Sequence, residues 1–276
     1  MTRTWLVTGS SRGFGRALCE SIIDAGDNLV ATARDPARLA PLIEMGGDRV
    51  AVARLDVTND RDAQAAVAAA VDRFGALDVL VNNAGYGDIG SVEDTPLEAF
   101  RAQIEANLFG TIIMTKAAIP HMRARRSGHI VQFSSVGGRV GAPGRAGYSA
   151  AKWGIEGFSE VLAQEMRLIG VHVTIVEPGG FRTDFAGAST HIETGHADYD
   201  AVVGRAARMQ QAYDGKQPGD PRKGAQAILA VVNAKDPPLR LALGRDALAA
   251  IEQADRARLA ELLLWRELSE STDHAK

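Results

Sequence analysis

Short runs of apolar, often β-branched residues recur along the chain, and a longer stretch with helical periodicity follows each of them. Several runs are almost wholly apolar, as expected for strands that are covered on both faces. Seven such runs are predicted strands, namely Thr4–Thr8, Asn28–Ala33, Val50–Asp56, Leu77–Asn82, His129–Ser134, Val171–Glu177 and Leu239–Leu243. The connections are long enough to hold helices. This alternation predicts an α/β fold: a doubly wound, mostly parallel, seven-stranded sheet with helices on both faces.

One domain is expected over residues 1–276, because no linker rich in Pro, Gly or Ser divides the chain. Residues 184–220 are polar and rich in glycine and follow the sixth strand, so we expect them to form a lid over a substrate. Residues 245–276 form a predicted helical extension with an apolar stripe that includes Ile251 and Leu262. Packing of this stripe on the core is the favoured interpretation, and packing on a partner chain is the alternative.

The amino-acid composition excludes several classes of protein and of binding site. The chain has 276 residues, of which 46% are hydrophobic and 24% charged, as is typical of a soluble globular protein. Its net charge of −3 argues against a nucleic-acid binder that works by neutralising phosphates. A single cysteine, Cys19, excludes a disulfide framework and a Cys-rich zinc site, and no metal is expected. No apolar stretch reaches the ~18 residues of a membrane span. We therefore expect a cytoplasmic protein.

A glycine-rich turn follows the first predicted strand and precedes a predicted helix, Arg16–Ala25. Backbone N–H groups and the helix dipole favour a pyrophosphate at such a position. Gly9 allows the tight turn, whereas Gly13 and Gly15 allow close approach of phosphate and of helix to strand. The spacing, G-x-x-x-G-x-G, differs from the generic G-x-G-x-x-G pattern, and a purely structural role for the glycines is the alternative.

The end of the second predicted strand indicates which dinucleotide is bound. An acidic residue there would bond the ribose 2′-hydroxyl of NAD, whereas arginine suits the 2′-phosphate of NADP. Ala33 supplies no carboxylate, and Arg34 offers a planar fork for phosphate. Asp35 is the rival candidate, but its place before Pro36 favours helix capping. Together with Arg12 in the glycine turn, Arg34 favours NADP(H).

Four polar residues further along the chain are candidates for chemistry: Asn107, Ser135, Tyr148 and Lys152. Tyr148 and Lys152 are four residues apart, so on a helix they share a face. Free tyrosine titrates near ~10, and the adjacent ammonium is expected to lower the pKa of Tyr148 and make it a general acid/base. Ser135 comes at the carboxyl end of the fifth predicted strand. Asn107 within a helical stretch could simply bond a neighbouring carbonyl.

In combination these residues resemble the short-chain dehydrogenase/reductase superfamily. The resemblance covers roughly Thr4 to Phe185 and continues more loosely to about Leu243. It rests on Thr8-Gly9-x-x-x-Gly13-x-Gly15, Asp56-Val57, Asn82-Asn83-Ala84-Gly85, Asn107, Ser135, Tyr148-x-x-x-Lys152 and Pro178-Gly179 with Thr183. It implies a Rossmann-type fold.

The resemblance also implies a role for each of the four candidates. Tyr148 would exchange a proton with the substrate oxygen, and Ser135 would hydrogen-bond that oxygen. Lys152 would bind the nicotinamide ribose, while Asn107 would hold a water that links Lys152 to solvent. The residues implied in binding the dinucleotide are Gly9, Ser11, Arg12, Gly13, Phe14, Gly15, Arg34, Asp56, Val57, Asn83, Ala84, Gly85, Tyr148, Lys152, Pro178, Gly179, Phe181 and Thr183.

The function expected from the sequence is therefore an NADP(H)-dependent oxidoreductase that interconverts a secondary alcohol and a ketone or aldehyde. A bulky or apolar substrate, steroid-like or retinoid-like, is suggested by similarity to members with the same second-strand ending and C-terminal extension. Side chains suggested to contact the substrate are Tyr86, Val136, Arg139, Arg145, Phe181, Phe185, His191, His196, Tyr199, Arg205, Met209 and Tyr213. A catalytically silent dinucleotide-sensing regulator is the main alternative, and an epimerase or dehydratase is a third. By resemblance, a homodimer or homotetramer is expected.

Overall fold

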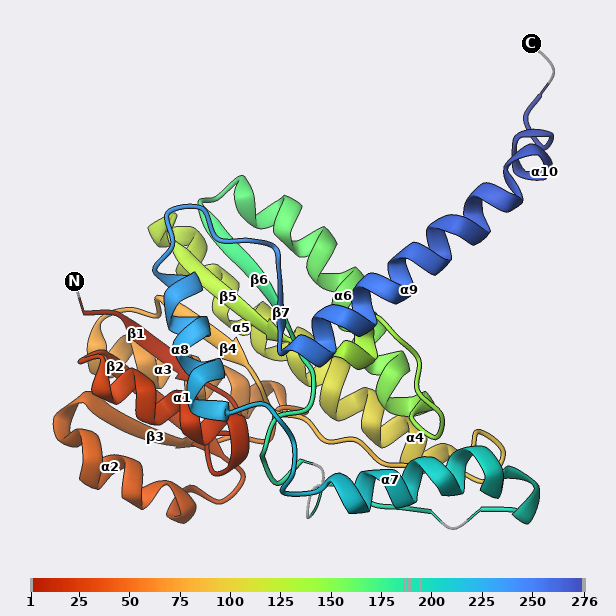
Figure 1. Cartoon of the computed structure of the whole chain (residues 1–276). Coiled ribbons are helices and arrows are strands. Elements are labelled where there is room, and N and C mark those ends of the chain that lie inside the picture. Colours follow the sequence, from red (N-terminus) through yellow and green to blue (C-terminus); the bar gives the residue numbers. More distant parts are fainter. Residues whose placement is uncertain (1, 186, 188–189, 194, 275–276) are drawn as a thin grey trace.

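A computed structural model describes residues 2–185, 187, 190–193 and 195–274. Its centre is one sheet of seven strands in the order β3-β2-β1-β4-β5-β6-β7, and all six pairings between neighbours are parallel (Figure 1). The strands are β1 (Thr4–Val7), β2 (Asn28–Ala33), β3 (Val50–Arg54), β4 (Val79–Asn82), β5 (Gly128–Phe133), β6 (Val171–Pro178) and β7 (Arg240–Leu243). The seven predicted strands are confirmed, with ends that shift by one or two residues.

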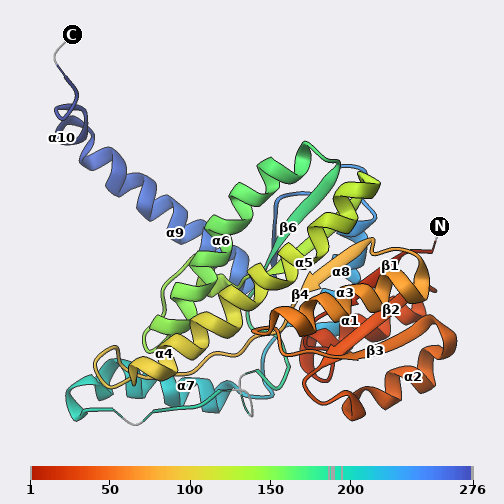
Figure 2. The same cartoon turned by 180° about the vertical axis from the view of Figure 1, so that it is seen from behind.

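Helices cover both faces of the sheet (Figures 1 and 2). Helices α1, α2 and α8 pack on one face, and α3, α5 and α6 pack on the other. The α-helices are α1 (Gly13–Asp24), α2 (Ala40–Gly46), α3 (Asp60–Phe74), α4 (Leu97–Ile104), α5 (Gly110–Arg125), α6 (Ala146–Arg167), α7 (Arg205–Tyr213), α8 (Pro221–Val232), α9 (Arg245–Leu264) and α10 (Arg266–Glu270). The predicted doubly wound α/β fold is confirmed.

The central strands are apolar at most positions because their two faces enter two different cores. In β1, Trp5 and Val7 belong to the core beneath α1 and α8, while Leu6 belongs to the core beneath α3 and α5. In β4, Val79 and Leu80 divide in the same way. Successive side chains of a strand point to opposite faces, so a sheet covered on both sides favours apolar residues on both faces of each strand.

The strand order reverses between β1 and β4, which lie side by side at the middle of the sheet. The chain runs from β1 to one side and from β4 to the other, so the connections at the carboxyl ends of these two strands diverge. In open α/β sheets ligands bind at such a switch point. Helix α1 begins at Gly13, three residues earlier than predicted, and this brings the glycine-rich turn directly to the carboxyl end of β1.

The described part of residues 184–220 crosses the carboxyl edge of the sheet. It includes a single 3₁₀ turn (Ala197–Tyr199), a π-helical turn (Asp200–Gly204) and α7. Isolated bridges join Ile89 to Ile192 and Phe181 to Gly219. Helix α7 lies outside the two helical layers, below the strand ends in Figure 1.

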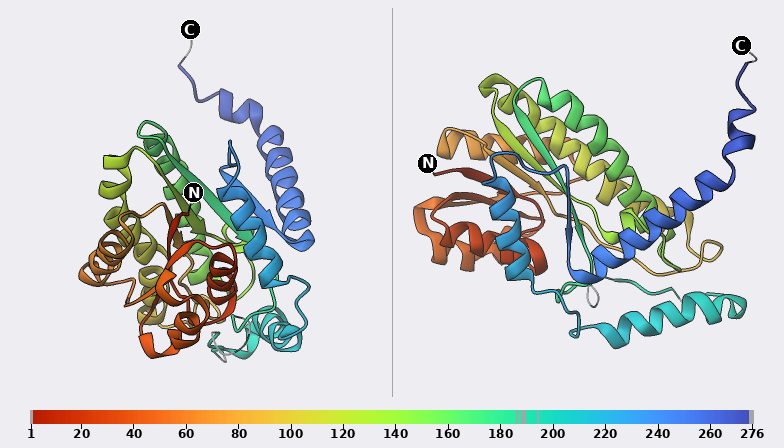
Figure 3. Two further views of the ribbon diagram at one scale, coloured as in Figure 1. Left: turned by 90° about the vertical axis from the view of Figure 1, so that its left-hand side faces the viewer. Right: turned by 45° about the horizontal axis from the view of Figure 1, so that its top comes forward.

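The C-terminal extension departs from the favoured prediction. Helix α9 buries only Ala247 and Ile251, and it then leaves the molecule at the β7 edge of the sheet (Figure 3). Leu248 is 58% exposed and Leu262 is 65% exposed. Packing of the stripe on the core is therefore wrong beyond Ile251, because β7 is the last strand and offers no further sheet surface. In the part of the chain that the structure describes, no helix combines the length and apolar composition needed to cross a bilayer.

Candidate active site

Two adjoining cavities lie at the carboxyl edge of the sheet. The glycine-turn cavity, of about 520 Å³, is bounded by the turn after β1, the ends of β2 and β3 and residues 83–86. The tyrosine cavity, of about 300 Å³, is bounded by the ends of β5 and β6 and the start of α6. Both are lined by Phe14, Asn83, Gly85, Thr183 and Phe185. Together they form one elongated space, as an extended ligand with two ends requires.

The turn after β1 leaves no room for side chains at its glycines. Gly9 and Gly13 have φ of 71° and 57°, a region that favours glycine. A Cβ on Gly15 would lie 2.3 Å from the carbonyl oxygen of Gly9. The hydroxyl of Thr8 accepts hydrogen bonds from the backbone N–H groups of Asn83 and Ala84, both at 2.9 Å, and so fixes the turn against the end of β4. The resulting cradle, with the N-terminus of α1 beside it, suits a pyrophosphate.

Asn83 and the residues after β4 line the glycine-turn cavity as the sequence suggested, but the Asn83 side chain has a bracing contact. Its Nδ2 donates to the carbonyl oxygen of Thr8 at 2.9 Å. The neighbouring Asn82 donates to the Thr115 hydroxyl and the Gln132 amide oxygen, which ties β4 to α5 and β5. Contacts from residues 83–85 to a ligand therefore come mainly from the backbone.

Two arginines line the glycine-turn cavity, and neither forms an ion pair with an acidic side chain of the described residues. Arg12 lies in the glycine turn, and Arg34 follows the last residue of β2, Ala33. The rival candidate Asp35 caps the next turn by accepting a hydrogen bond from the backbone N–H of Ala37 at 3.1 Å. It is absent from the cavity lining. The rim of the glycine-turn cavity thus presents two guanidinium groups.

Asp56 and Val57 line the same cavity after β3. Asp56 accepts hydrogen bonds from the backbone N–H and the hydroxyl of Thr58, at 3.0 and 2.7 Å. These bonds hold the pKa of the Asp56 carboxyl below its usual value, and Arg34 and Arg54 lower it further. Asp56 is thus a fixed, ionised acceptor. Gly110 packs against Val57, and a Cβ on Gly110 would lie 2.6 Å from the Cγ2 atom of Val57.

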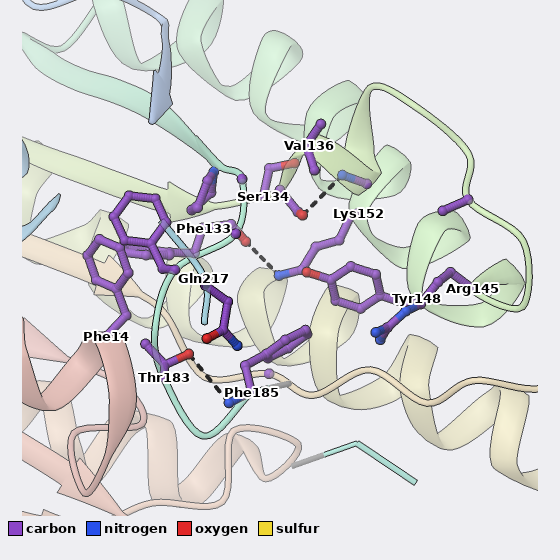
Figure 4. A pocket seen from close by; sticks show the side chains of 18 of the residues that line it. Phe14, Phe133, Ser134, Val136, Arg145, Tyr148, Lys152, Thr183, Phe185 and Gln217 are labelled. Carbon is purple, nitrogen blue, oxygen red and sulfur yellow. Dashed lines mark hydrogen bonds between the residues drawn. The ribbon is translucent and has the colours of Figure 1, made fainter. Parts of the chain in front are cut away.

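Ser135, Tyr148 and Lys152 all line the tyrosine cavity. Figure 4 shows Tyr148 and Lys152 next to each other there. Tyr148 and Lys152 come from consecutive turns of α6, and Ser135 follows β5. The Nζ atom of Lys152 donates to the carbonyl oxygen of Phe133 at 2.7 Å and lies 5.6 Å from the centre of the Tyr148 ring. The Tyr148 side chain packs against Phe185, with 5.5 Å between ring centres. The sequence correctly predicted that these three residues share one site.

The predicted electrostatic relation between Tyr148 and Lys152 is wrong for this structure. Burial raises the pKa of Tyr148 above its ordinary value, although the Ser135 hydroxyl and the guanidinium of Arg145 lower it in part. Burial also lowers the pKa of Lys152 to about 8, against the opposing effect of Glu156. Lys152 donates to the carbonyl oxygen of Phe133, and the cation that opposes the rise of the Tyr148 pKa is Arg145. Its guanidinium carbon lies 5.9 Å from the Tyr148 ring centre.

Asn107 lies in a π-helical turn (Glu105–Phe109) between α4 and α5. Its Nδ2 donates to the carbonyl oxygens of Tyr86 and Gln103, both at 2.9 Å, so the neighbouring-carbonyl interpretation is confirmed for that atom. Its Oδ1 is buried and has no hydrogen-bond partner among the described residues. A Cβ on Gly85 would lie 2.4 Å from this oxygen and 3.7 Å from the Nζ of Lys152. An unsatisfied buried acceptor here suits a water molecule near Lys152.

An aromatic cluster lies at the junction of the two cavities. Phe14 packs against Phe133 and Phe181, with ring centres 5.0 and 5.1 Å apart. Pro178, Gly179 and Thr183 line the tyrosine cavity beside them, after β6. Thr183 and Phe14 also line the glycine-turn cavity, so this cluster lies where the two cavities adjoin.

Sequence reasoning missed Gln217. This side chain is 2% exposed and lines the tyrosine cavity, and both polar atoms of its amide lack a hydrogen-bond partner among the described residues. Figure 4 shows it beside Phe185, across the cavity from Tyr148. No spacing pattern marks Gln217, because it lies in an irregular segment between α7 and α8. Its unsatisfied amide is available to a polar group of a ligand.

The residues suggested to contact substrate divide into two groups. Those that line the tyrosine cavity are Val136, Arg145, Phe181, Phe185 and Tyr213. Arg139 is outside it, with ion pairs to Glu177 at 2.9 Å and Asp255 at 2.6 Å. Tyr199 is also outside and donates its hydroxyl to Glu93 at 2.5 Å. Tyr86 lines the glycine-turn cavity instead, and Arg205 and Met209 line a third cavity beside α7.

His191 and His196, also suggested as substrate contacts, lie away from the tyrosine cavity. Their rings are exposed and pair with Glu193 and Asp198, both at 3.3 Å. Within the described ranges no group of three His, Cys, Asp or Glu side chains could hold a metal ion.

A buried carboxyl lies one turn beyond Lys152. Glu156 is 5% exposed and pairs with Arg240 at 2.7 Å, while Glu177 and Arg139 lie close by. Burial raises the pKa of Glu156 to about 7, Glu177 adds to this effect, and Ser134 and the two arginines oppose it. Because Glu156 is four residues after Lys152, the helical spacing that revealed the Tyr148–Lys152 pair could have found it.

Replacing Glu156 by glutamine should flatten the dependence of stability on pH. The folded-state pKa is raised, so the native protein binds more protons than the unfolded chain between about pH 4.5 and 7. The contribution of Glu156 to the free energy of unfolding of the wild type is therefore present at pH 5. It falls by about 2 kcal/mol as the pH rises towards 8. Urea unfolding at pH 5, 6, 7 and 8 measures the loss. Glu160→Gln removes another carboxyl that pairs with Arg240 and is the control. An unchanged pH profile in Glu156→Gln would contradict the expected effect.

Three comparisons with known proteins agree with this geometry. Residues 3–193 match the family model described as short chain dehydrogenase. A protein named oxidoreductase BOA17 from Botryotinia fuckeliana is 44% identical over 270 residues, which cover 98% of each chain. A 3-ketodihydrosphingosine reductase from Bacteroides thetaiotaomicron is 36% identical over 241 residues, 87% of each chain.

The fold also matches an experimental structure over nearly its whole length. The crystal structure of a short-chain dehydrogenase from Streptomyces avermitilis has a TM-score of 0.93 and 40% sequence identity, with 99% of this chain and 98% of that chain covered. The match extends past β7 into the C-terminal extension. The chain belongs to the short-chain dehydrogenase/reductase superfamily of oxidoreductases.

Proposed function

We propose that this chain is an NADP(H)-dependent oxidoreductase that interconverts a secondary alcohol and a ketone or aldehyde, with a bulky or apolar substrate. One observation carries the proposal. Ser135, Tyr148 and Lys152 converge on a cavity that adjoins a glycine cradle with two unpaired arginines at its rim. A carbonyl oxygen beside Tyr148 would then lie at the end of the space that the dinucleotide fills.

The residues present fit this cofactor. The N–H groups of the glycine turn would hold the pyrophosphate, and Arg12 and Arg34 would hold the 2′-phosphate. Asp56 with Val57 would contact the adenine, and the backbone of residues 83–85 would contact the adenosine ribose. The nicotinamide and its ribose would lie against Lys152, Phe181 and the segment from Pro178 to Thr183. When bound, NADPH supplies the hydride.

Tyr148 would supply the proton in carbonyl reduction. Its raised pKa keeps the phenol protonated at neutral pH, which is the form needed to donate a proton to a carbonyl oxygen. Ser135 would hold the same oxygen by a hydrogen bond. Lys152 and a water on the Oδ1 of Asn107 would return a proton to Tyr148 from solvent. The direction favoured by this arrangement is reduction.

A catalytically silent dinucleotide sensor is the alternative function. It would need the cradle but not the polar side chains around the tyrosine cavity. Ser135, Tyr148 and Lys152 are all present there, next to a space of about 300 Å³. This combination favours an enzyme over a sensor and over an epimerase or dehydratase.

A carbonyl screen tests the proposed function. With aldehydes, ketones, steroids and retinoids as candidate substrates, we expect NADPH to be consumed in a one-to-one ratio with one class of carbonyl. Absorbance of NADPH and chromatography of the alcohol product measure the ratio. Binding of NADPH without turnover of any carbonyl would favour the sensor, and turnover without net NADPH loss would favour the epimerase or dehydratase.

An assembly of two or four copies stays a prediction. Apolar side chains in the turn before α5, on α6 and directly after α6 are exposed: Phe109 (46%), Trp153 (44%), Val161 (56%) and Leu168 (76%). Such side chains are typical of a surface that another chain covers. Light scattering of the intact protein would give the mass in solution.

A further inference from the structure

A third cavity, the α7 groove, opens from the tyrosine cavity. It has a volume of about 820 Å³ and lies between α7 with the turn before it and the loop that precedes α6. Ala142, Arg145, Gln210 and Tyr213 line both the groove and the tyrosine cavity. The two spaces are therefore continuous, and these four residues form the neck between them.

The walls of the groove are apolar. Ala142 and Pro143 lie on one side, and Ala201, Val202, Ala206, Met209 and Ala212 lie on the other. Ile89, which is only 2% exposed, adds to the lining. Among the described residues that line the groove, Arg145 and Arg205 are the charged ones.

Large apolar side chains remain exposed in this groove. Val202 is 56% exposed, Met209 is 62% exposed and Tyr213 is 40% exposed. All three belong to the same short segment, and an apolar ligand lying between α7 and the loop would cover them. Covering exposed apolar surface is favourable at about 25 cal/mol per Å².

The neck lies beside the ring of Tyr148. The Arg145 guanidinium carbon is 5.9 Å from the centre of the Tyr148 ring and 6.0 Å from that of Phe185, and its Nη1 donates to the carbonyl oxygen of Gly87 at 2.9 Å. Arg145 is thus held in place by two rings and a carbonyl. A substrate with its oxygen at Tyr148 can extend past Arg145 into the α7 groove.

We propose that the α7 groove binds the flexible aliphatic tail of a substrate whose carbonyl carbon lies beside Tyr148. The inference rests on the proposed function and narrows its substrate class to unbranched alkyl or alkenyl ketones. The tyrosine cavity has only about 300 Å³ and must also receive the nicotinamide, so most of a large substrate must lie elsewhere. A chain can bend through the neck between Arg145 and Tyr213, whereas a rigid fused-ring system needs one wide cavity.

A chain-length series tests the inference. Initial rates of NADPH oxidation are measured with 2-butanone, 2-hexanone, 2-octanone, 2-decanone and 2-dodecanone. We expect kcat/KM to rise by about two- to fourfold for each methylene that enters the groove and then to level off. The measured quantity is the ratio of kcat/KM for 2-dodecanone to that for 2-butanone.

Matched variants on α7 test whether the aliphatic tail of the substrate lies in the α7 groove. Met209→Glu places a charge in the groove and should lower the 2-dodecanone/2-butanone ratio by at least about tenfold. Gln211→Glu places the same charge on the same helix outside the groove lining, and it should keep the wild-type ratio. An equal fall in both variants would overturn the inference, because the effect would then come from charge on α7 in general.

The remaining outcomes separate the inference from the proposed function. If 2-butanone is reduced and the series is flat in the wild type, the groove does not hold a tail, while the oxidoreductase proposal stands. If Met209→Glu instead changes the mass seen by light scattering, the groove is an interface between copies, and the inference fails.

If no ketone is reduced, the proposed function fails for these substrates, and calorimetry with 2-dodecanol and the NADP⁺-loaded protein decides about the groove. Weaker binding in Met209→Glu but not in Gln211→Glu would support a tail site. Equal binding in both variants and the wild type would overturn it.

Discussion

Tyr148→Phe is expected to lower kcat by about 10²- to 10⁴-fold while the dissociation constant for NADPH changes by less than about threefold. The substitution removes one oxygen atom, the proposed proton donor, and leaves the ring that packs against Phe185 and Arg145. Ser135 would still hold the substrate oxygen, so the loss is of proton transfer and not of binding. Steady-state oxidation of NADPH with the best carbonyl of the screen measures kcat, and fluorescence titration measures cofactor affinity.

Tyr199→Phe is the matched control for this experiment. It removes the same atom from a tyrosine whose hydroxyl bonds to Glu93 and which lies outside the tyrosine cavity. We expect its kcat to stay within about twofold of wild type. If Tyr148→Phe retained wild-type turnover, the proton would have to come from another group, and the proposed chemistry would be wrong.

The second large effect concerns cofactor choice. In the double variant Arg12→Ala/Arg34→Asp, the preference for NADPH over NADH should fall by about 10²- to 10⁴-fold. A hydrogen bond to a charged group contributes about 1.5–3 kcal/mol, and about 1.4 kcal/mol corresponds to a factor of ten. Neither guanidinium has an ion-pair partner within the described residues, so both are available to a phosphate. The new carboxylate at position 34 would also accept a hydrogen bond from the 2′-hydroxyl of NADH.

The control for the double variant must change the net charge equally. Arg38→Asp/Arg61→Ala does so with exposed arginines that are absent from the glycine-turn cavity. Ratios of kcat/KM for NADPH and NADH are compared across the three proteins. If both double variants shifted the ratio alike, the cause would be the general field of the protein. A ratio that stays at the wild-type value would mean that the 2′-phosphate is held elsewhere.

The sheet could be predicted from the sequence for a definite physical reason. A strand buried on both faces favours apolar side chains at consecutive positions, as Trp5, Leu6 and Val7 show, and such runs stand out along a chain. The glycine turn could also be predicted, because Gly9 has a positive φ and Gly15 lies where a Cβ has no room. Both signals are local, and the structure adds only the spatial order of the strands.

The meeting of Ser135, Tyr148 and Lys152 was predictable from helical spacing and strand ends, whereas their electrostatics was not. The pKa of Tyr148 depends on how deeply it is buried and on the Arg145 side chain, which comes from the loop before α6. The carbonyl oxygen of Phe133, on β5, holds the Lys152 ammonium. Desolvation and such long-range contacts leave no mark in the spacing of residues, so the expected direction of the shift was wrong.

The apolar stripe of the C-terminal extension shows a different limit of prediction from the sequence. Periodicity correctly indicated a helix with leucines along it, but periodicity does not say what covers the leucines. The structure shows that the sheet ends at β7, so Leu248 and Leu262 find no core. The aliphatic groove beside α7 was hidden for a similar reason, since Met209 and Ile89 are far apart in the chain.

Amide hydrogen exchange at the projecting end of α9 can report whether a second chain binds there. Beyond Ile251 the helix is held mainly by ion pairs within its own length, such as Glu252 with Arg256, and by contacts of Asp255 and Arg258 with Arg139. Helical segments with so little tertiary support fray readily in water, so their amide hydrogens should exchange long before those of β1 and β4. Slow amide hydrogen exchange between residues 259 and 270 would indicate that a second chain covers them. This measurement does not depend on catalytic activity.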